Sequence, residues 1–223
     1  MRDQRGTTMV ELLVGISMTL IILAAVFTLT TAVLHGQDRI LRRVDANQRA
    51  RPVMTRIVQG LHSACVTSHI APIQTGSTGT SISFFSKNGS AVGPTPDLHT
   101  VSLSGTTLSE AVYPATGGTA PNWTFSGTPS SSGQILTKVA APGGVIFRYY
   151  DFVSGALNTT PLPTPLSSTN AARVSYVTVT FTSSPSNGVS TLDPKSPLLL
   201  TDAVDLRLEN AGQYPNQDNL PCV

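Results

Sequence analysis

The stretch MVELLVGISMTLIILAAVFTLTTAVL, residues 9 to 34, decides the architecture of this chain, and its single charged residue is Glu11. These 26 residues exceed the roughly 20 that an α-helix needs to cross the hydrocarbon core of a bilayer. A cleaved secretory signal has an apolar core of about 7–15 residues that ends at a small-x-small site. This run is longer and no such site closes it, so the sequence predicts a retained membrane helix over residues 7–34.

The predicted helix continues beyond the apolar run as an amphipathic, basic stem over residues 35–64. Apolar residues recur there at intervals of three or four, with arginines on the intervening face: Ile40, Leu41, Val44, Met54, Ile57, Val58, Leu61 and Cys65. Pro52 lies inside this pattern and predicts a kink, because it lacks an N–H and its ring crowds the preceding turn. One helix from residue 7 to about 64 would be roughly 87 Å long.

The basic residues of the chain are concentrated in this stem, although the net charge is only +2. Residues 35–64 contain two carboxylates and six arginines: Arg39, Arg42, Arg43, Arg49, Arg51 and Arg56. The stretch has no aromatic residue, so we expect no direct nucleic-acid binding. Charged residues make up 12% of the chain, about half the usual share, and Ser, Thr, Gly and Pro dominate its second half. This composition favours an extracytoplasmic domain over a cytosolic enzyme.

Two signals in the sequence disagree about the orientation of the membrane helix. The flank before the helix offers Arg2 and Arg5, whereas the flank after it offers Arg39, Arg42 and Arg43. The positive-inside rule would therefore place the C-terminal domain in the cytoplasm. The composition of that domain favours the opposite side, and the periodicity of the helix does not decide between them.

After Cys65 the helical period ends and a β-rich head domain is expected over residues 65–223. Six segments show alternation and β-branched or aromatic enrichment, namely 80–86, 99–114, 133–140, 144–151, 172–182 and 196–210. Ser104-Gly105-Thr106 predicts a hairpin turn within the second of them. Segments 115–133 and 153–171 are expected to be loops. The predicted fold class is α+β, with one long N-terminal helix packed on an antiparallel β-sheet head domain.

The two cysteines, Cys65 and Cys222, are too far apart in sequence to form a metal knuckle or a thioredoxin-type motif. In an oxidising compartment they could form a disulfide that ties down the C-terminus. The alternative is two unrelated buried thiols.

No constellation of residues predicts catalysis, a metal site or a cofactor site. The four histidines, His35, His62, His69 and His99, are scattered, and we expect surface or stem positions for them. Serines are abundant, but there is no GxSxG motif. The acidic residues near the C-terminus lack the spacing and glycine of a calcium loop, so a solvated face is expected for Asp193, Asp202, Asp205 and Glu209.

The pattern Gly6-Thr7-Thr8-Met9-Val10-Glu11-Leu12-Leu13 resembles the class III signal of type IV pilins and type II secretion pseudopilins. The resemblance implies that residues 1–6 are a leader peptide and that a prepilin peptidase cuts between Gly6 and Thr7. It also implies methylation of the new amine on Thr7, although the family commonly has phenylalanine at this position. Glu11 would then pair with the amino terminus of a neighbouring subunit. The alternative is that Glu11 only reaches the lipid headgroups.

The order of parts after the helix resembles, more diffusely, the PilW-like, J-type minor pseudopilin branch of the same superfamily. This resemblance implies a pilin-like fold and a low-copy subunit that acts at the initiation or tip of a type IV pilus or type II secretion filament. The implied partners are other major and minor pilin subunits, a prepilin peptidase, an inner-membrane assembly platform and, before assembly, membrane lipid. The implied location is the bacterial cytoplasmic membrane, in a single pass, with the head domain outside.

Two rival hypotheses belong to other functional classes. The first is a single-pass, membrane-anchored, extracytoplasmic binding domain that does not polymerise. The second is a signal-anchored envelope enzyme, which the missing catalytic constellation disfavours. On the leading hypothesis the chain is not an enzyme but the substrate of one.

Overall fold

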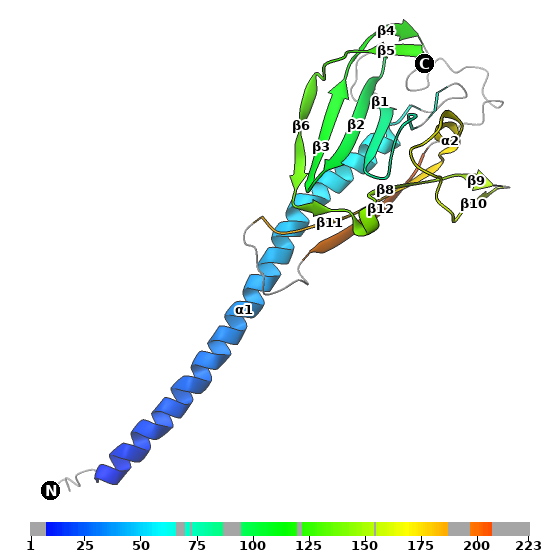
Figure 1. The fold of residues 1–223 in the computed structure, drawn as a ribbon. Coiled ribbons are helices and arrows are strands. Elements are labelled where there is room, and N and C mark those ends of the chain that lie inside the picture. The colour runs from blue at the N-terminus through cyan, green and yellow to red at the C-terminus, as the bar shows by residue number, and fades with distance from the viewer. Residues whose placement is uncertain are drawn as a thin grey trace.

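The computed structural model describes residues 8–65, 70–71, 73–86, 95–119, 122–153, 155–186 and 197–206, excluding the side chains of residues 38 and 39. The fold is α+β, as expected, with one long N-terminal helix followed by antiparallel sheets (Figure 1). Helix α1 spans Met9–His62, so its 54 residues are about 80 Å long. Its first part projects alone, and its last turns lie on the head domain (Figure 1).

The last turns of α1 form part of the core of the head domain. Residues at helical spacing on one face are buried: Ala46, Ala50, Val53, Met54, Ile57 and Leu61. Ala46 and Ala50 let the helix backbone approach the sheets closely because their side chains are small. The helix runs through Pro52 without interruption, and Pro52 itself lies on the exposed side. The helix ends at His62 and is capped by Ser63, whose N–H donates to the Gln59 carbonyl over 3.0 Å.

The first sheet has the order β1-β2-β3-β6 and is antiparallel throughout. Its strands are β1 (Ser81–Ser86), β2 (Asp97–Ser104), β3 (Thr107–Tyr113) and β6 (Ser131–Thr137). The predicted hairpin between residues 104 and 106 is confirmed. Gly105 has φ of 58°, a left-handed conformation that suits glycine because it has no Cβ.

The second sheet is built around β11 (Tyr176–Ser183). This strand pairs with β12 (Leu198–Asp205) on one side and with β7 (Val139–Ala140) and β8 (Phe147–Tyr150) on the other. Alternate residues of β11 are buried, as the period of two requires. The predicted strand 133–140 is divided at Lys138, whose φ of 60° turns the chain from the first sheet into the second.

Two segments that we expected to be loops contain regular structure, and this part of the prediction is wrong. Segment 115–133 contains the hairpin of β4 (Ala115–Thr119) and β5 (Asn122–Phe125), and β6 begins at Ser131. Segment 153–171 includes the hairpin of β9 (Phe152–Val153) and β10 (Ala156–Leu157). Helix α2 (Ser168–Arg173) follows, so the strand expected over 172–182 begins only at Tyr176. The Ser167 side chain caps this helix by accepting from the Asn170 N–H.

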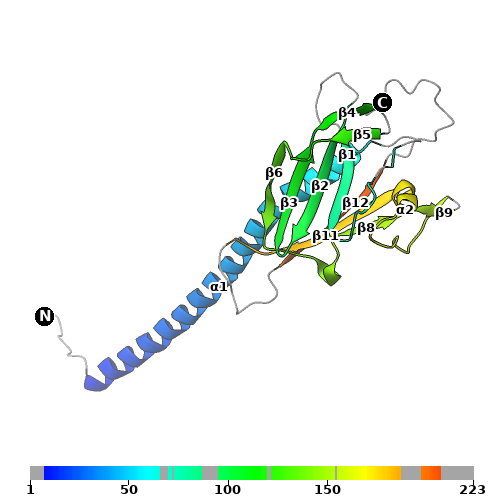
Figure 2. The same ribbon diagram turned by 45° about the horizontal axis from the view of Figure 1, so that its top comes forward.

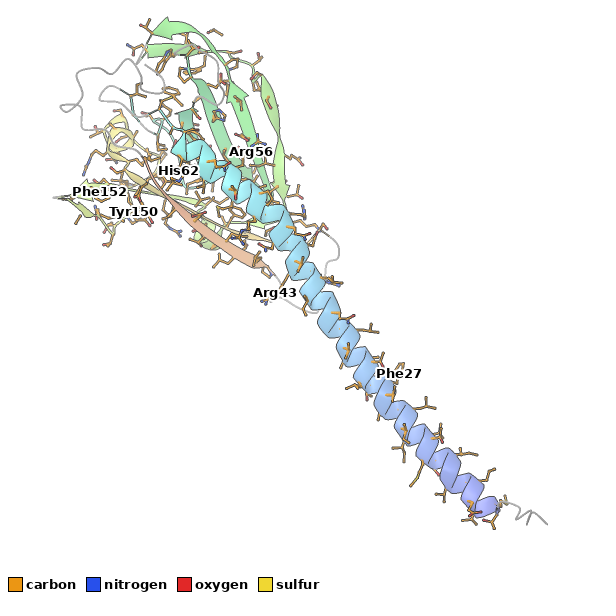
Figure 3. All side chains as sticks on the ribbon, turned by 180° about the vertical axis from the view of Figure 1, so that it is seen from behind. Phe27, Arg43, Arg56, His62, Tyr150 and Phe152 are labelled. Carbon is orange, nitrogen blue, oxygen red and sulfur yellow. The ribbon has the colours of Figure 1, made fainter. Side chains whose placement is uncertain are left out.

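The main hydrophobic core joins α1 to both sheets. It combines Ile57 and Leu61 of α1 with Phe84 of the first sheet and Phe147 and Phe181 of the second. Figure 2 shows the two sheets from another side, and Figure 3 shows α1 lying across the back of the head domain. A short 3-10 helix, η1 (Pro142–Gly144), links β7 to β8. The head domain and the second half of α1 are therefore one packed unit.

Candidate functional site

The N-terminal end of α1 places Glu11 in a capping box. The Thr8 N–H donates to Glu11 Oε2 over 3.1 Å, and the Thr8 hydroxyl donates to the same oxygen over 3.3 Å. In return the Glu11 N–H donates to Thr8 Oγ1 over 3.4 Å. These bonds occupy backbone N–H groups that have no partner within the helix. The carboxylate therefore lies at the start of the helix, where the helix dipole favours negative charge.

Our sequence reasoning missed this local role of Glu11. The signal was readable, because Thr8 and Glu11 form the T-x-x-E pattern that precedes an apolar run. The predicted processing residues Gly6 and Thr7 lie outside the described residues, so cleavage and methylation stay predictions.

The first half of α1 is apolar around its whole circumference, and no described part of the chain covers it. Met9, Leu13, Ile21 and Phe27 are 83%, 62%, 69% and 70% exposed, and the most apolar window of the helix has no buried residue. An apolar face on every side is typical of a helix whose neighbours are lipid or other helices. By length and composition α1 can span a membrane.

The hydroxyl groups in this half bond to the helix itself. Thr19, Thr28, Thr30 and Thr31 donate to carbonyls three or four residues earlier, at 2.7–2.9 Å. Ser17 does the same to the Leu13 carbonyl. Because each hydroxyl has an internal acceptor, these residues impose little cost in an apolar surrounding. The hydroxyl groups of this half can therefore be buried without new polar partners, whereas the Glu11 carboxylate cannot.

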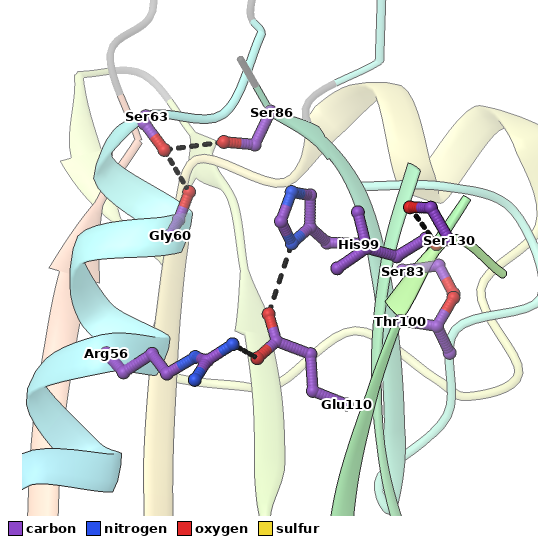
Figure 4. A network of polar contacts seen from close by, with 10 residues as sticks. Arg56, Gly60, Ser63, Ser83, Ser86, His99, Thr100, Glu110 and Ser130 are labelled. Carbon is purple, nitrogen blue, oxygen red and sulfur yellow. Dashed lines mark hydrogen bonds and ion pairs between the residues drawn. The ribbon is translucent and has the colours of Figure 1, made fainter. Parts of the chain in front are cut away.

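Where α1 meets the first sheet, a charged network joins them (Figure 4). Arg56 Nη2 lies 2.7 Å from Glu110 Oε2, and His99 Nδ1 lies 3.1 Å from Glu110 Oε1. The Glu110 side chain is 9% exposed, whereas that of Arg56 is 61% exposed. The hydrogen bond from His99, and secondarily the Arg56 charge, hold the pKa of Glu110 below its ordinary value against the opposing effect of burial. The network thus fastens the stem helix to β2 and β3.

His99 corrects our expectation of a surface or stem histidine. It is 6% exposed and stacks on Phe84, with ring centroids 5.5 Å apart. The other neighbour of the ring is Glu110, which lies on the adjacent strand. His35 and His62 are exposed, as expected, and His69 lies outside the described residues.

Two further polar contacts hold the stem where it enters the head domain. Asp45 Oδ2 accepts from the Ser186 N–H over 2.7 Å and from its hydroxyl over 2.9 Å. These bonds lower the pKa of Asp45. Arg49 reaches the first sheet, where its Nη2 donates to Thr137 Oγ1 over 3.0 Å. Asp45 and Arg49 therefore tie α1 to two separate segments of the head domain.

Cys65 lies three residues after the end of α1 and is fully buried. It takes part in a disulfide. The predicted partner Cys222 lies outside the described residues, so the pairing of these two residues stays a prediction.

The remaining candidate residues have structural or solvent-exposed positions. Trp123 and Phe125 lie 5.7 and 5.0 Å from the ring of Phe85, which agrees with packing on their own domain. Asp202 and Asp205 are exposed, in agreement with a solvated face, while Asp193 and Glu209 lie outside the described residues. Within the described ranges no group of three or more His, Cys, Asp and Glu residues could hold a metal ion.

Comparison of the sequence with protein-family models and with curated proteins finds no match.

Proposed function

We propose that this chain is a minor pilin or pseudopilin, a subunit of a type IV pilus or type II secretion filament. The observation that carries the proposal is the contrast within α1, whose last turns are packed into the head domain while its first half is apolar on every side and covered by no described residue. Burying that surface is favourable by about 25 cal/mol per Å². Packing with the same helix of neighbouring subunits buries it once the chain leaves the lipid.

Glu11 supplies the register in this proposal. It is the one charged residue between Met9 and Leu34, and the capping box holds its carboxylate at the helix start. Cleavage after Gly6 would create a cationic amine on Thr7 four residues before it. The amine of one subunit can then pair with the carboxylate of the next, since a charge in an apolar bundle needs a partner.

The head domain gives the subunit its specificity for partners at the initiation or tip of the filament, and it lies outside the cytoplasm. The chain is a substrate of a prepilin peptidase and performs no catalysis in this proposal. An inner-membrane platform and other pilin subunits complete the assembly.

The first test is processing. The full chain is expressed with and without a prepilin peptidase, and its intact mass and N-terminal sequence are measured. We expect a form that starts at Thr7 only when the peptidase is present, and no such form from the Gly6→Val variant. If wild-type chain never yields a Thr7 terminus, the proposal is wrong. A periplasmic reporter fused after residue 70 tests the orientation, and a cytoplasmic signal would contradict it.

A second candidate function is the membrane-anchored binding domain that does not polymerise. The capping box favours it, because it gives Glu11 a purely local role. Two variants separate the candidates. Glu11→Gln removes the charge but can still complete a capping box, whereas Thr8→Ala removes the cap and keeps the charge. A filament subunit should lose assembly with Glu11→Gln and retain it with Thr8→Ala, and normal assembly of Glu11→Gln would favour the second candidate.

A further inference from the structure

A shallow groove of about 530 Å³ runs along the outward face of α1, opposite the face that enters the core. It surrounds Pro52, and six polar side chains of the same helix line it: Asn47, Gln48, Arg51, Thr55, Arg56 and Gln59. Figure 3 shows this side of α1 with Arg56 labelled. Among the described residues α1 alone lines the groove, so its open side is left to solvent or to a partner.

Pro52 gives the groove an acceptor. In an α-helix the N–H of residue 52 would donate to the carbonyl of residue 48, and proline has no N–H. The Gln48 carbonyl is therefore left without its helical donor on an exposed side of α1. A neighbouring polypeptide can supply that donor from its backbone or an amide side chain.

The charges at the groove are positive and lack a full complement of carboxylates. The sequence contains no Asp or Glu from residue 46 to residue 96. Arg56 is paired with Glu110, but Arg51 contacts no carboxylate within the described residues. Asp45 on α1 and Glu110 on β3 are already bonded to Ser186 and to His99, respectively. An exposed guanidinium with amides beside it fits a carboxylate, which accepts two parallel hydrogen bonds.

We infer that this groove is a docking site for a carboxylate-bearing segment of another subunit. The inference rests on the proposed function and names the chemistry of one partner surface. A polypeptide fits better than a nucleic acid, because its backbone N–H groups lie beside its carboxylates and can donate to the Gln48 carbonyl, and no described aromatic side chain lines the groove for base stacking.

The first experiment identifies the occupant in cells. A photoreactive amino acid replaces Thr55 in the full chain, and after irradiation the cross-linked peptide is mapped by mass spectrometry. The same probe at Arg43, which lies on α1 outside the groove, is the matched control. We expect the Thr55 probe alone to capture a peptide with at least two Asp or Glu residues from another subunit. Capture of a peptide without carboxylates, of nucleic acid, or of nothing overturns the inference.

The second experiment measures binding without an identified partner. A fluorescent hexaglutamate peptide is titrated with the full chain in neutral detergent micelles at low salt, and its anisotropy is followed. Arg51→Gln should raise Kd about three-fold, the scale of one exposed ion pair. Arg43→Gln removes the same charge from outside the groove and should leave Kd unchanged. Equal weakening by both variants would mean attraction without a site, and would overturn the inference.

Further titrations test the groove itself and the chemical class of its ligand. Thr55→Glu places a carboxylate in the groove and should weaken binding, whereas the size-matched Thr55→Gln should not. An oligothymidylate of equal charge should bind more weakly than hexaglutamate and should not respond to Arg51→Gln. Tighter oligothymidylate binding that does respond to Arg51→Gln would assign the groove to nucleic acid instead.

Failure of the proposed function and failure of this inference give different results. The absence of a Thr7 terminus contradicts the pilin proposal. Selective hexaglutamate binding by the same sample would still support the groove as a carboxylate-binding site. Normal cleavage and assembly together with identical Arg51→Gln and Arg43→Gln titrations would contradict the groove alone.

Discussion

The two halves of α1 are one continuous helix in two different environments. From Met9 to Val44 its large apolar residues are exposed, whereas from Ala46 onward one face is buried and the other is polar. Helix propensity does not explain the difference, because both halves are helical. The second half obtains its stability from the sheets of its own chain, and within the described residues the first half has no such partner. The first half therefore leaves its apolar surface open among the described residues, whereas the second half offers only a polar outer face.

The largest expected effect tests the buried half. Leu61→Ala removes a fully buried side chain and should lower the free energy of unfolding by about 2–5 kcal/mol. Leu23→Ala removes the same atoms from a site that is 59% exposed and should change it by less than about 0.5 kcal/mol. Urea titrations of the full chain in detergent, followed by the fluorescence of the single tryptophan, measure both. Equal effects would contradict the division of the helix.

The next effect concerns the network that attaches the stem. Glu110→Ala leaves His99 and Arg56 without their shared acceptor and should cost about 1–3 kcal/mol. Arg56→Gln should cost less, about 0–1 kcal/mol, because that side chain is largely exposed. The same urea titrations provide the comparison, and the reverse order of the two costs would show that the network is not organised around Glu110.

The pH dependence of stability should report the same carboxylates. The pKa values of Glu110 and Asp45 are lowered in the fold from ordinary values of 4.5 and 3.8. Each carboxyl group therefore contributes stability that is complete at pH values above its ordinary pKa. This contribution is lost as the pH falls through its lower pKa in the folded state. We expect wild-type chain to lose stability below about pH 4.5, and Glu110→Gln to lose less. Thermal unfolding at a series of pH values measures this, and parallel curves would refute it.

The smallest effect concerns the far end of the exposed half. Thr8→Ala removes the cap that accepts from the Glu11 N–H and should destabilise the first turn by about 0.5–2 kcal/mol. Faster amide exchange should appear near residues 9–12 while the protection of the head domain stays the same. Uniformly faster exchange would mean that the two halves are coupled more strongly than we infer.

The helix was predictable because its signals are local. The apolar run and the spacing of Met54, Ile57 and Leu61 place α1 and its buried face correctly. The same predicted face included Ile40, Leu41 and Val44, and this part is wrong, because these residues precede the turns that contact the head domain and are exposed. The strands with clear alternation, such as 176–183, were also found. The hairpin of β4 and β5 was missed, because glycine and threonine at those positions resemble a loop although the backbone pairs. Helix α2 was missed because six residues are too few for a visible period.

The polar sites also divide into those with a local sequence pattern and those formed by long-range contacts. Glu11 was found from its spacing after Gly6, although its capping partner Thr8 was overlooked in the same stretch. No local pattern connects Arg56, His99 and Glu110, because they come from α1, β2 and β3 and meet only when the first sheet packs on the helix. Long-range contacts of this kind depend on the fold, and periodicity in the sequence does not encode them.

The clamp between Asp45 and Ser186 has a mechanical consequence. The part of α1 from Met9 to Val44 extends about 54 Å beyond that clamp, at roughly 1.5 Å per residue. On a lever of that length a rotation of about 5° at the clamp displaces the far end by about 5 Å, close to one helical turn. Small adjustments where the helix enters the head domain thus become large displacements of Glu11.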